Sequence, residues 1–180
     1  MKSKRDSDIE SEKRQNELVE HTIKFCDLIS DDLRSCPDNL ILLTLTGHLI
    51  VEELMDMTLA FVLGLREFPK NDRGESLLSF YEKLRLIQAV VCEREPGPNA
   101  DLLCVIKMLN KVRNALGHKL KKQAEIEEMI ETLLKSYYQK TGKKRDPTKP
   151  LPTLLRHCLV NLCEFLIKLQ RHFYNLENKL

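Results

Sequence analysis

The chain has 180 residues, of which 42% are hydrophobic and 31% are charged, with a formal net charge of +2. This length supports one domain that buries roughly 70% of its extended-chain surface, so a core needs no disulfide or structural metal. A net charge so close to zero does not by itself indicate a nucleic-acid binder, and any such function must rest on local charge. The first 14 residues lack the apolar core of a secretory signal, and no apolar run reaches the roughly 18 to 20 residues that span a bilayer. We therefore expect a cytoplasmic protein without a membrane segment.

Apolar residues recur at helical spacing along the chain, and no segment alternates as a strand does. We predict a single all-α domain over 1–180, a helical bundle of five or six helices. Residues 1–35 form a helical extension with a thin apolar stripe, and an almost wholly apolar central helix follows the Asp38 and Asn39 start signal. Ser76 is the expected cap of the next helix. The remaining predicted elements are helices over 101–118 and 123–140, an exposed loop over 141–151 and a final long helix over 152–177.

The predicted helix that ends with "LNKVRNALGH" carries three side chains suited to phosphate-ester chemistry. Arg113 offers a planar donor fork for a phosphate, His118 can act as a general acid or base, and Asn114 can orient either one. Asn114 and His118 share a helix face, whereas Arg113 and His118 diverge by about 140° unless the helix bends or ends at Gly117. These groups suffice for metal-free cleavage of RNA, which supplies its own 2'-hydroxyl nucleophile.

The stretch "RNALGH" resembles the R-x4-6-H motif of the HEPN superfamily, with Arg113 and His118 at the defining positions and Asn114 in the polar place that follows the arginine. The segments "LTGHLIVEELMD", "SFYEKLRLIQAV" and "LNKVRNALGH" resemble the mannitol-repressor-like branch, and residues 40–120 would form the HEPN-like core. The resemblance implies a helical homodimer in which two motifs face each other across a cleft. It also implies metal-independent RNA cleavage or RNA binding in a bacterial toxin, defence or stress system, with an antitoxin or regulatory protein as partner. The mannitol-repressor-like branch implies the alternative of a non-catalytic regulator that acts through protein contacts.

Two simpler interpretations accompany the motif. Arg113 and His118 are also favourable as cations at the C-terminal end of a helix, where they contribute about 0.3 to 1 kcal/mol each. The surrounding lysines either attract RNA or form a solvated face. These RNA-binding candidates are Lys107, Lys111, Lys119, Lys121 and Lys122. The "KKRD" stretch at 143–146 allows the same two interpretations.

On the central helix, His48, Glu52 and Asp56 recur every four residues and form one polar stripe. We expect Glu52 or Glu53 to reach Arg113 or His118, and we favour Glu52 because it lies on this stripe. The alternatives are a structural pairing of Glu52 with Arg85 or Arg113, and a metal site built from the stripe.

Cofactors and metals are not expected. The six cysteines contain no C-x-x-C pair and mostly lie within helical apolar patterns, which indicates reduced thiols. A zinc site from His157, Cys158 and Cys163 is disfavoured because residues 157 and 158 point about 100° apart on a helix. Phosphate-binding glycine loops and H-E-x-x-H are absent from the sequence, which leaves nucleotide hydrolysis by a P-loop and zinc proteolysis without support.

Overall fold

The structure is a computed structural model that describes residues 31–65, 67–94, 100–118 and 122–177, together with residues 13, 17, 20, 24 and 29. At residues 92–94, 100, 118 and 173–177 it describes the backbone alone. The predicted all-α bundle is confirmed, and extended pairing within the described residues is limited to one isolated bridge between Lys70 and Ser76. The helices are α2 (Leu40–Val62), α3 (Phe80–Arg94), α4 (Ala100–His118), α5 (Gln123–Thr141) and α6 (Leu151–Glu177).

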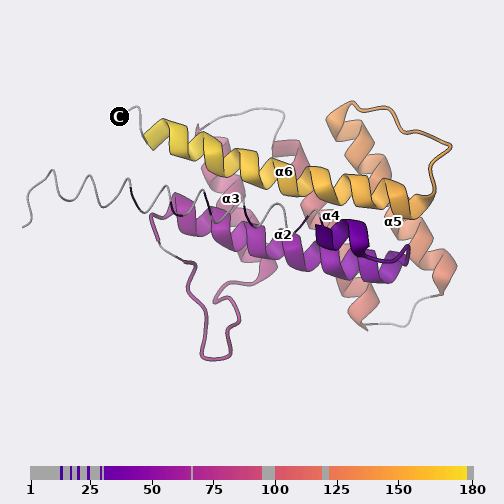
Figure 1. Cartoon of the computed structure of the whole chain (residues 1–180), viewed down its shortest axis with the longest axis horizontal. Helices are drawn as coiled ribbons and strands as arrows, with labels where there is room; N and C mark the ends of the chain where they lie inside the picture. Colours follow the sequence, from indigo (N-terminus) through magenta and orange to yellow (C-terminus); the bar gives the residue numbers. More distant parts are fainter. Residues whose placement is uncertain are drawn as a thin grey trace, which may run out of the picture.

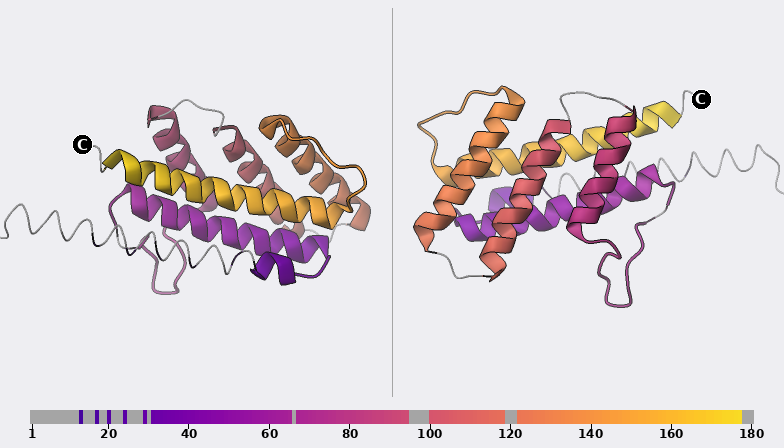
Figure 2. Two further views of the ribbon diagram at one scale, coloured as in Figure 1. Left: turned by 45° about the horizontal axis from the view of Figure 1, so that its top comes forward. Right: turned by 180° about the vertical axis from the view of Figure 1, so that it is seen from behind.

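The helices form two layers. The long helices α2 and α6 lie side by side and run in the same direction (Figure 1). On one side of this pair, α3, α4 and α5 form a second layer whose neighbours run antiparallel and cross α2 and α6 steeply (Figure 2). Gly47 permits the close approach of α2 to α6, because a Cβ atom there would lie 2.5 Å from Leu159 Cδ1. The second layer carries the motif helix α4.

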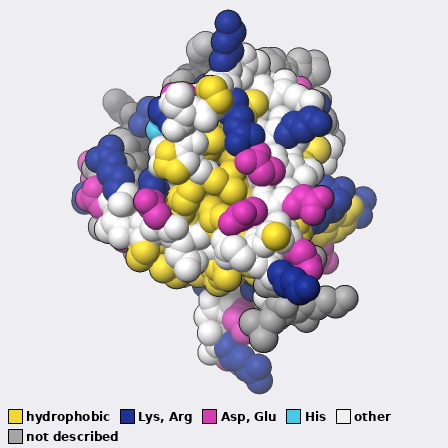
Figure 3. Space-filling view, turned by 90° about the vertical axis from the view of Figure 1, so that its right-hand side faces the viewer, with side chains coloured by type: hydrophobic (Ala, Val, Ile, Leu, Met, Phe, Trp, Pro, Cys, Tyr) yellow, Lys and Arg dark blue, Asp and Glu magenta, His cyan; other side chains and the backbone are white. Residues whose placement is uncertain are grey.

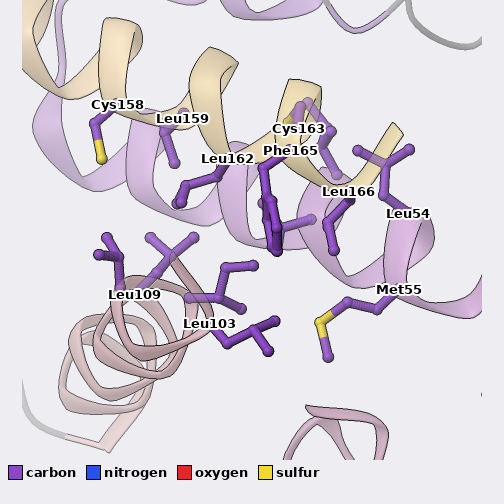
Figure 4. Close-up of a cluster of buried hydrophobic side chains, with 14 of the residues drawn as sticks. Leu54, Met55, Leu103, Leu109, Cys158, Leu159, Leu162, Cys163, Phe165 and Leu166 are labelled. Atoms are coloured by element: carbon purple, nitrogen blue, oxygen red, sulfur yellow. The ribbon is translucent and has the colours of Figure 1, made fainter. Parts of the chain in front are cut away.

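The hydrophobic core lies between the layers. Figure 4 shows leucines of α6 pointing toward Leu103 and Leu109 of α4, with Leu54 and Met55 of α2 beside them. Leu109 of α4 is fully buried. It lies about two turns before the end of the polar motif on that helix. Burial of such side chains contributes roughly 1.5 to 3 kcal/mol each and fixes the position of α4 against α2 and α6.

Local signals explain where the helices begin. Asn39 caps α2, since its side-chain oxygen accepts from the Leu42 N–H at 3.0 Å. The prediction that Ser76 caps the next helix is wrong. Ser79 takes this role in a capping box, where the Glu82 N–H donates to the Ser79 hydroxyl at 3.4 Å and the Ser79 N–H donates to the Glu82 carboxylate at 2.8 Å. Ser76 instead donates to Asp56 at 3.1 Å.

The N-terminal extension is helical at 31–35, and most of it lies outside the described residues. Leu33 is fully buried. Arg156 of α6 donates to the carbonyl oxygens of Leu33 and Cys36 at 2.7 and 2.9 Å and pairs with Asp38 at 2.9 Å. This guanidinium satisfies the free carbonyls at the end of the extension and ties it to α6.

The connection from α5 to α6 spans 142–150, and α6 begins at Leu151. Gly142 adopts a left-handed conformation with φ of 66° and ends α5, as glycine commonly does after a helix. Among the described helices, none is long and apolar enough to cross a bilayer.

An apolar area occupies the end of the bundle where α2 and α6 begin. Figure 3 shows hydrophobic side chains in the middle of this face, with charged side chains around them. Ile41 and Leu42 in the first turn of α2 are exposed, and Leu49 two turns later is 63% exposed. Spacings of seven and eight residues place all three on one side of α2. Such a stripe is suited to contact with another molecule.

Candidate functional site

The end of α4 presents Arg113 and Asn114 at the surface. Arg113 is exposed and Asn114 is half-buried, and Arg113 Nη1 donates to Asn114 Oδ1 at 3.1 Å. Among the described residues, no carboxylate pairs with Arg113. A guanidinium has five N–H groups, so most of its donors remain free to bind an anion.

His118 is the last residue of α4, and its side chain lies outside the described part of the structure. The helix continues through Gly117 to His118, so it does not end between Arg113 and His118. Along a regular helix, Asn114 and His118 occupy one face, and Arg113 points about 140° away from His118. The hydrogen bond from Arg113 to Asn114 brings the guanidinium to the side of α4 that carries Asn114.

A buried histidine of α2 lies against the same part of α4. His48 is 2% exposed, its Nε2 atom lies 3.0 Å from Asn110 Oδ1, and its ring stacks on Phe80 with centroids 4.6 Å apart. Asn110 precedes Asn114 by one helical turn. From the central helix α2, His48 therefore contacts both the start of α3 and the polar end of α4.

Burial lowers the pKa of His48 below its ordinary value, because the imidazolium loses its hydration. The hydrogen bond with Asn110 and the charge of Glu52 raise this pKa in part, whereas the charges of Arg113 and Lys83 lower it further. The Nδ1 atom is buried without a hydrogen bond and lies 3.8 Å from Glu52 Oε2. The pKa of His48 thus depends on charges of α2, α3 and α4.

The acidic residues of the stripe bind a buried lysine of α3. Lys83 Nζ lies 3.1 Å from Glu52 Oε1 and 2.9 Å from Asp56 Oδ2, and its side chain is 1% exposed. Ser76 donates to the second Asp56 oxygen. Glu52 therefore contacts His48 and Lys83, and the alternative pairings with Arg85 and Arg113 are not found among the described contacts.

Lys83 and Asn110, which bind the polar stripe of α2, were not predicted from the sequence. The missed signal for Lys83 was its position three residues after Phe80 and four before Ile87, which places it on the buried stripe of α3. A polar stripe in an apolar helix requires partners, and a lysine at such a position is the natural one. Asn110 holds the equivalent inward position on α4.

Glu53, the other expected acidic residue, points elsewhere. It pairs with Lys70 in the α2–α3 connection at 3.6 Å, and both side chains are partly exposed. The side chains of Glu52 and Glu53 thus point in different directions, as their 100° separation on a helix requires, and Glu52 points inward.

Neither candidate metal site forms a metal-binding group within the described residues. On α2 the Lys83 ammonium lies at hydrogen-bonding distance from Glu52 and Asp56 and supplies the positive charge there. On α6, Cys158 is buried, and burial raises the pKa of its thiol far above the ordinary value, while His157 is exposed. A protonated thiol is a poor metal ligand.

The lysines near the motif are partly described. Lys107, Lys111 and Lys122 are exposed, and Lys119 and Lys121 lie outside the described residues. In the 143–146 stretch, Lys143 donates to Asn161, and Arg145 pairs with Glu131. This loop is held against α5 and α6 by its own cations.

We expect the stability of the protein to fall in mildly acidic solution because of His48. The folded state holds the pKa of His48 below its ordinary value of 6.5, so the unfolded chain takes up the proton first as the pH decreases. The contribution is complete above pH 6.5 and is lost as the pH falls toward the folded pKa. Urea denaturation at a series of pH values measures this loss, and His48→Gln should flatten the profile. An unchanged profile in this variant would show that other groups cause it.

Glu52→Gln is expected to lower the pKa of His48 further, because the Glu52 charge raises it in the parent. Glu53→Gln is the matched control, since Glu53 pairs with Lys70. An NMR titration of the histidine ring protons measures the pKa of His48 in both variants. The same titration reports on His118, where a change in the Glu52 variant alone would extend the coupling to the motif. Equal His48 pKa values in both variants would refute the coupling.

No protein-family model, curated protein or solved structure matches the chain in the comparisons made with each.

Proposed function

We propose that the protein is a HEPN-like RNA-binding protein that cleaves RNA without a metal at the end of α4. The observation that carries the proposal is the exposed Arg113, which has a hydrogen bond to Asn114 and no carboxylate partner among the described residues. An arginine used only for structure usually ends on a carboxylate or on carbonyl oxygens, as Arg156 does in this chain. Arg113 is instead arranged to receive an anion.

In the proposed reaction, Arg113 binds the scissile phosphate and stabilises the charge that develops on its oxygens. The imidazole of His118 takes the proton of the 2'-hydroxyl, whose oxygen forms a bond to phosphorus while the bond to the 5'-oxygen breaks. The leaving 5'-oxygen receives a proton from a second imidazolium, and the products end in a 2',3'-cyclic phosphate and a 5'-hydroxyl. Asn114 orients Arg113 through their hydrogen bond.

The second imidazolium is the reason to propose a homodimer. Two copies that place their α4 ends together supply one His118 as the base and one as the acid. The exposed residues Ile41, Leu42 and Leu49 lie on α2, the helix whose His48 contacts α4 near Arg113. We propose that a second copy covers this stripe.

Leu49→Glu is expected to dissociate the dimer, because it places a charge at the most exposed residue of the stripe that the second copy would cover. Leu86→Glu is the matched control, since Leu86 is an exposed leucine of α3 outside the stripe. Light scattering after size-exclusion chromatography measures the mass of both variants. A parent protein that is monomeric at all concentrations would rule out the shared site.

The test of the activity itself is incubation of the purified protein with total RNA in EDTA. New fragments ending in 2',3'-cyclic phosphate would support metal-independent cleavage. Intact RNA at high protein concentration would refute the enzyme and favour the regulator, for which the exposed leucines of α2 would be a protein-docking surface.

A further inference from the structure

On the surface formed by α3 and α4, an aromatic ring lies next to a cation. The cation belongs to α4, the helix that also carries the motif. Tyr81 in the first turn of α3 is 50% exposed, and Lys107 Nζ of α4 lies 5.5 Å from the centre of its ring. The two helices are antiparallel neighbours (Figure 2, right). A half-exposed tyrosine contributes less to the core than a buried one. Lys107 lies over one face of the ring, and half of the tyrosine's surface remains exposed to solvent.

Positive and polar groups continue from this ring toward the motif. On α4, residues 107, 111, 114 and 118 fall within an arc of about 60°, and they extend over about 16 Å of helix. Lys107 and Lys111 are exposed, and neither forms an ion pair with a described carboxylate. This line is as long as several stacked nucleotides at about 3.4 Å each.

The α3 side of the surface has the same character. Arg85 lies one turn after Tyr81, is exposed and has no ion pair with a described carboxylate. Glu82, which adjoins Tyr81, uses its carboxylate to accept two hydrogen bonds from Ser79, and these bonds lower its pKa. Glu82 therefore stays ionised, and the surface around the ring carries its carboxylate beside three cations, Arg85, Lys107 and Lys111.

We propose that Tyr81 stacks on an unpaired base of an RNA strand that lies along α4, while Lys107 and Lys111 contact its phosphates on the way to Arg113. The inference rests on the proposed function and adds a substrate class, RNA that is single-stranded beside the cleaved phosphate. A duplex keeps its bases stacked on one another and has no free base face to offer Tyr81. Stacking on a protein ring is worth roughly a tenfold change in affinity for each base.

The binding test uses the full chain and a fluorescent single-stranded RNA of about twelve nucleotides, with a duplex of the same length for comparison. Tyr81→Leu should weaken single-strand binding about tenfold, and Tyr81→Phe, which keeps the ring, should change it less than about twofold. Lys107→Gln should weaken binding and reduce its salt dependence. Lys135→Gln is the control, because Lys135 is an exposed lysine of α5, which makes no contact with α3 among the described residues.

The absence of tryptophan from the chain provides a second measurement. Tyr81→Trp places a single tryptophan at the proposed stacking position, and we expect the single strand to quench its fluorescence and the duplex to leave it unchanged. Equal binding of both RNAs by the parent, or full single-strand affinity in Tyr81→Leu, would overturn the inference. If Arg113→Ala weakens RNA binding in that case, the proposed function stands without the stacking by Tyr81. If the parent binds no RNA, both fail.

Discussion

Alanine at Arg113 or at His118 is expected to lower metal-independent RNA cleavage at least about a hundredfold. General acid–base catalysis typically contributes 10²- to 10⁴-fold, and a donor aimed at the developing charge contributes about as much. Removal of the Arg113 side chain should leave the free energy of unfolding within about 1 kcal/mol of the parent, because the side chain is exposed and has one hydrogen bond to a neighbour. Fragment ends and rates measured in EDTA test the loss of activity, and thermal unfolding tests the stability.

The matched control is His157→Ala, which removes an exposed histidine from α6. It should leave cleavage unchanged. Mixing Arg113→Ala chains with His118→Ala chains tests whether two subunits share one site, since a mixed dimer that places one intact Arg113 beside one intact His118 should regain part of the activity. Activity retained in His118→Ala together with a large loss of stability would identify His118 as structural and refute the proposed mechanism.

The helices were predictable because their patterns depend on neighbours three and four residues apart. The apolar stripes of α4 and α6 and the Asn39 cap are local signals of this kind, and they agree with the structure. The start of α3 was misplaced because Ser76 and Ser79 are both plausible caps in the sequence. The reciprocal hydrogen bonds between Ser79 and Glu82 decide for Ser79, and the capping-box spacing from Ser79 to Glu82 was the available signal.

The polar neighbourhood of the site could be predicted only in part. Spacing alone places Glu52 inward and Glu53 outward, and the structure has them so. The identity of the partner depends on which face of α3 meets α2, a property of the packed layers and not of either segment alone. The partners considered from the sequence were therefore arginines, Arg85 and Arg113, whereas the structure places Lys83 between the two carboxylates.

Lys83→Met is expected to destabilise the fold by roughly 3 to 5 kcal/mol. The substitution keeps the unbranched side chain up to the ε position but removes the ammonium that binds Glu52 and Asp56, and Asp56 is then a nearly buried charge without its cation. The network also holds the start of α3 against α2, since Ser76 donates to the same carboxylate. Urea denaturation of the parent and the variant measures the loss.

Lys70→Met provides the comparison, because Lys70 also pairs with a glutamate of α2 but does so at the surface, where an ion pair contributes about 0 to 1 kcal/mol. The double variant Lys83→Met with Asp56→Asn should recover part of the lost stability, since most of the penalty belongs to the carboxylate left behind. The two side chains would then behave as one unit whose separate losses do not add. Equal small losses in Lys83→Met and Lys70→Met would show that Lys83 reaches solvent in the folded protein, and the buried network that joins α2 to α3 would have to be abandoned.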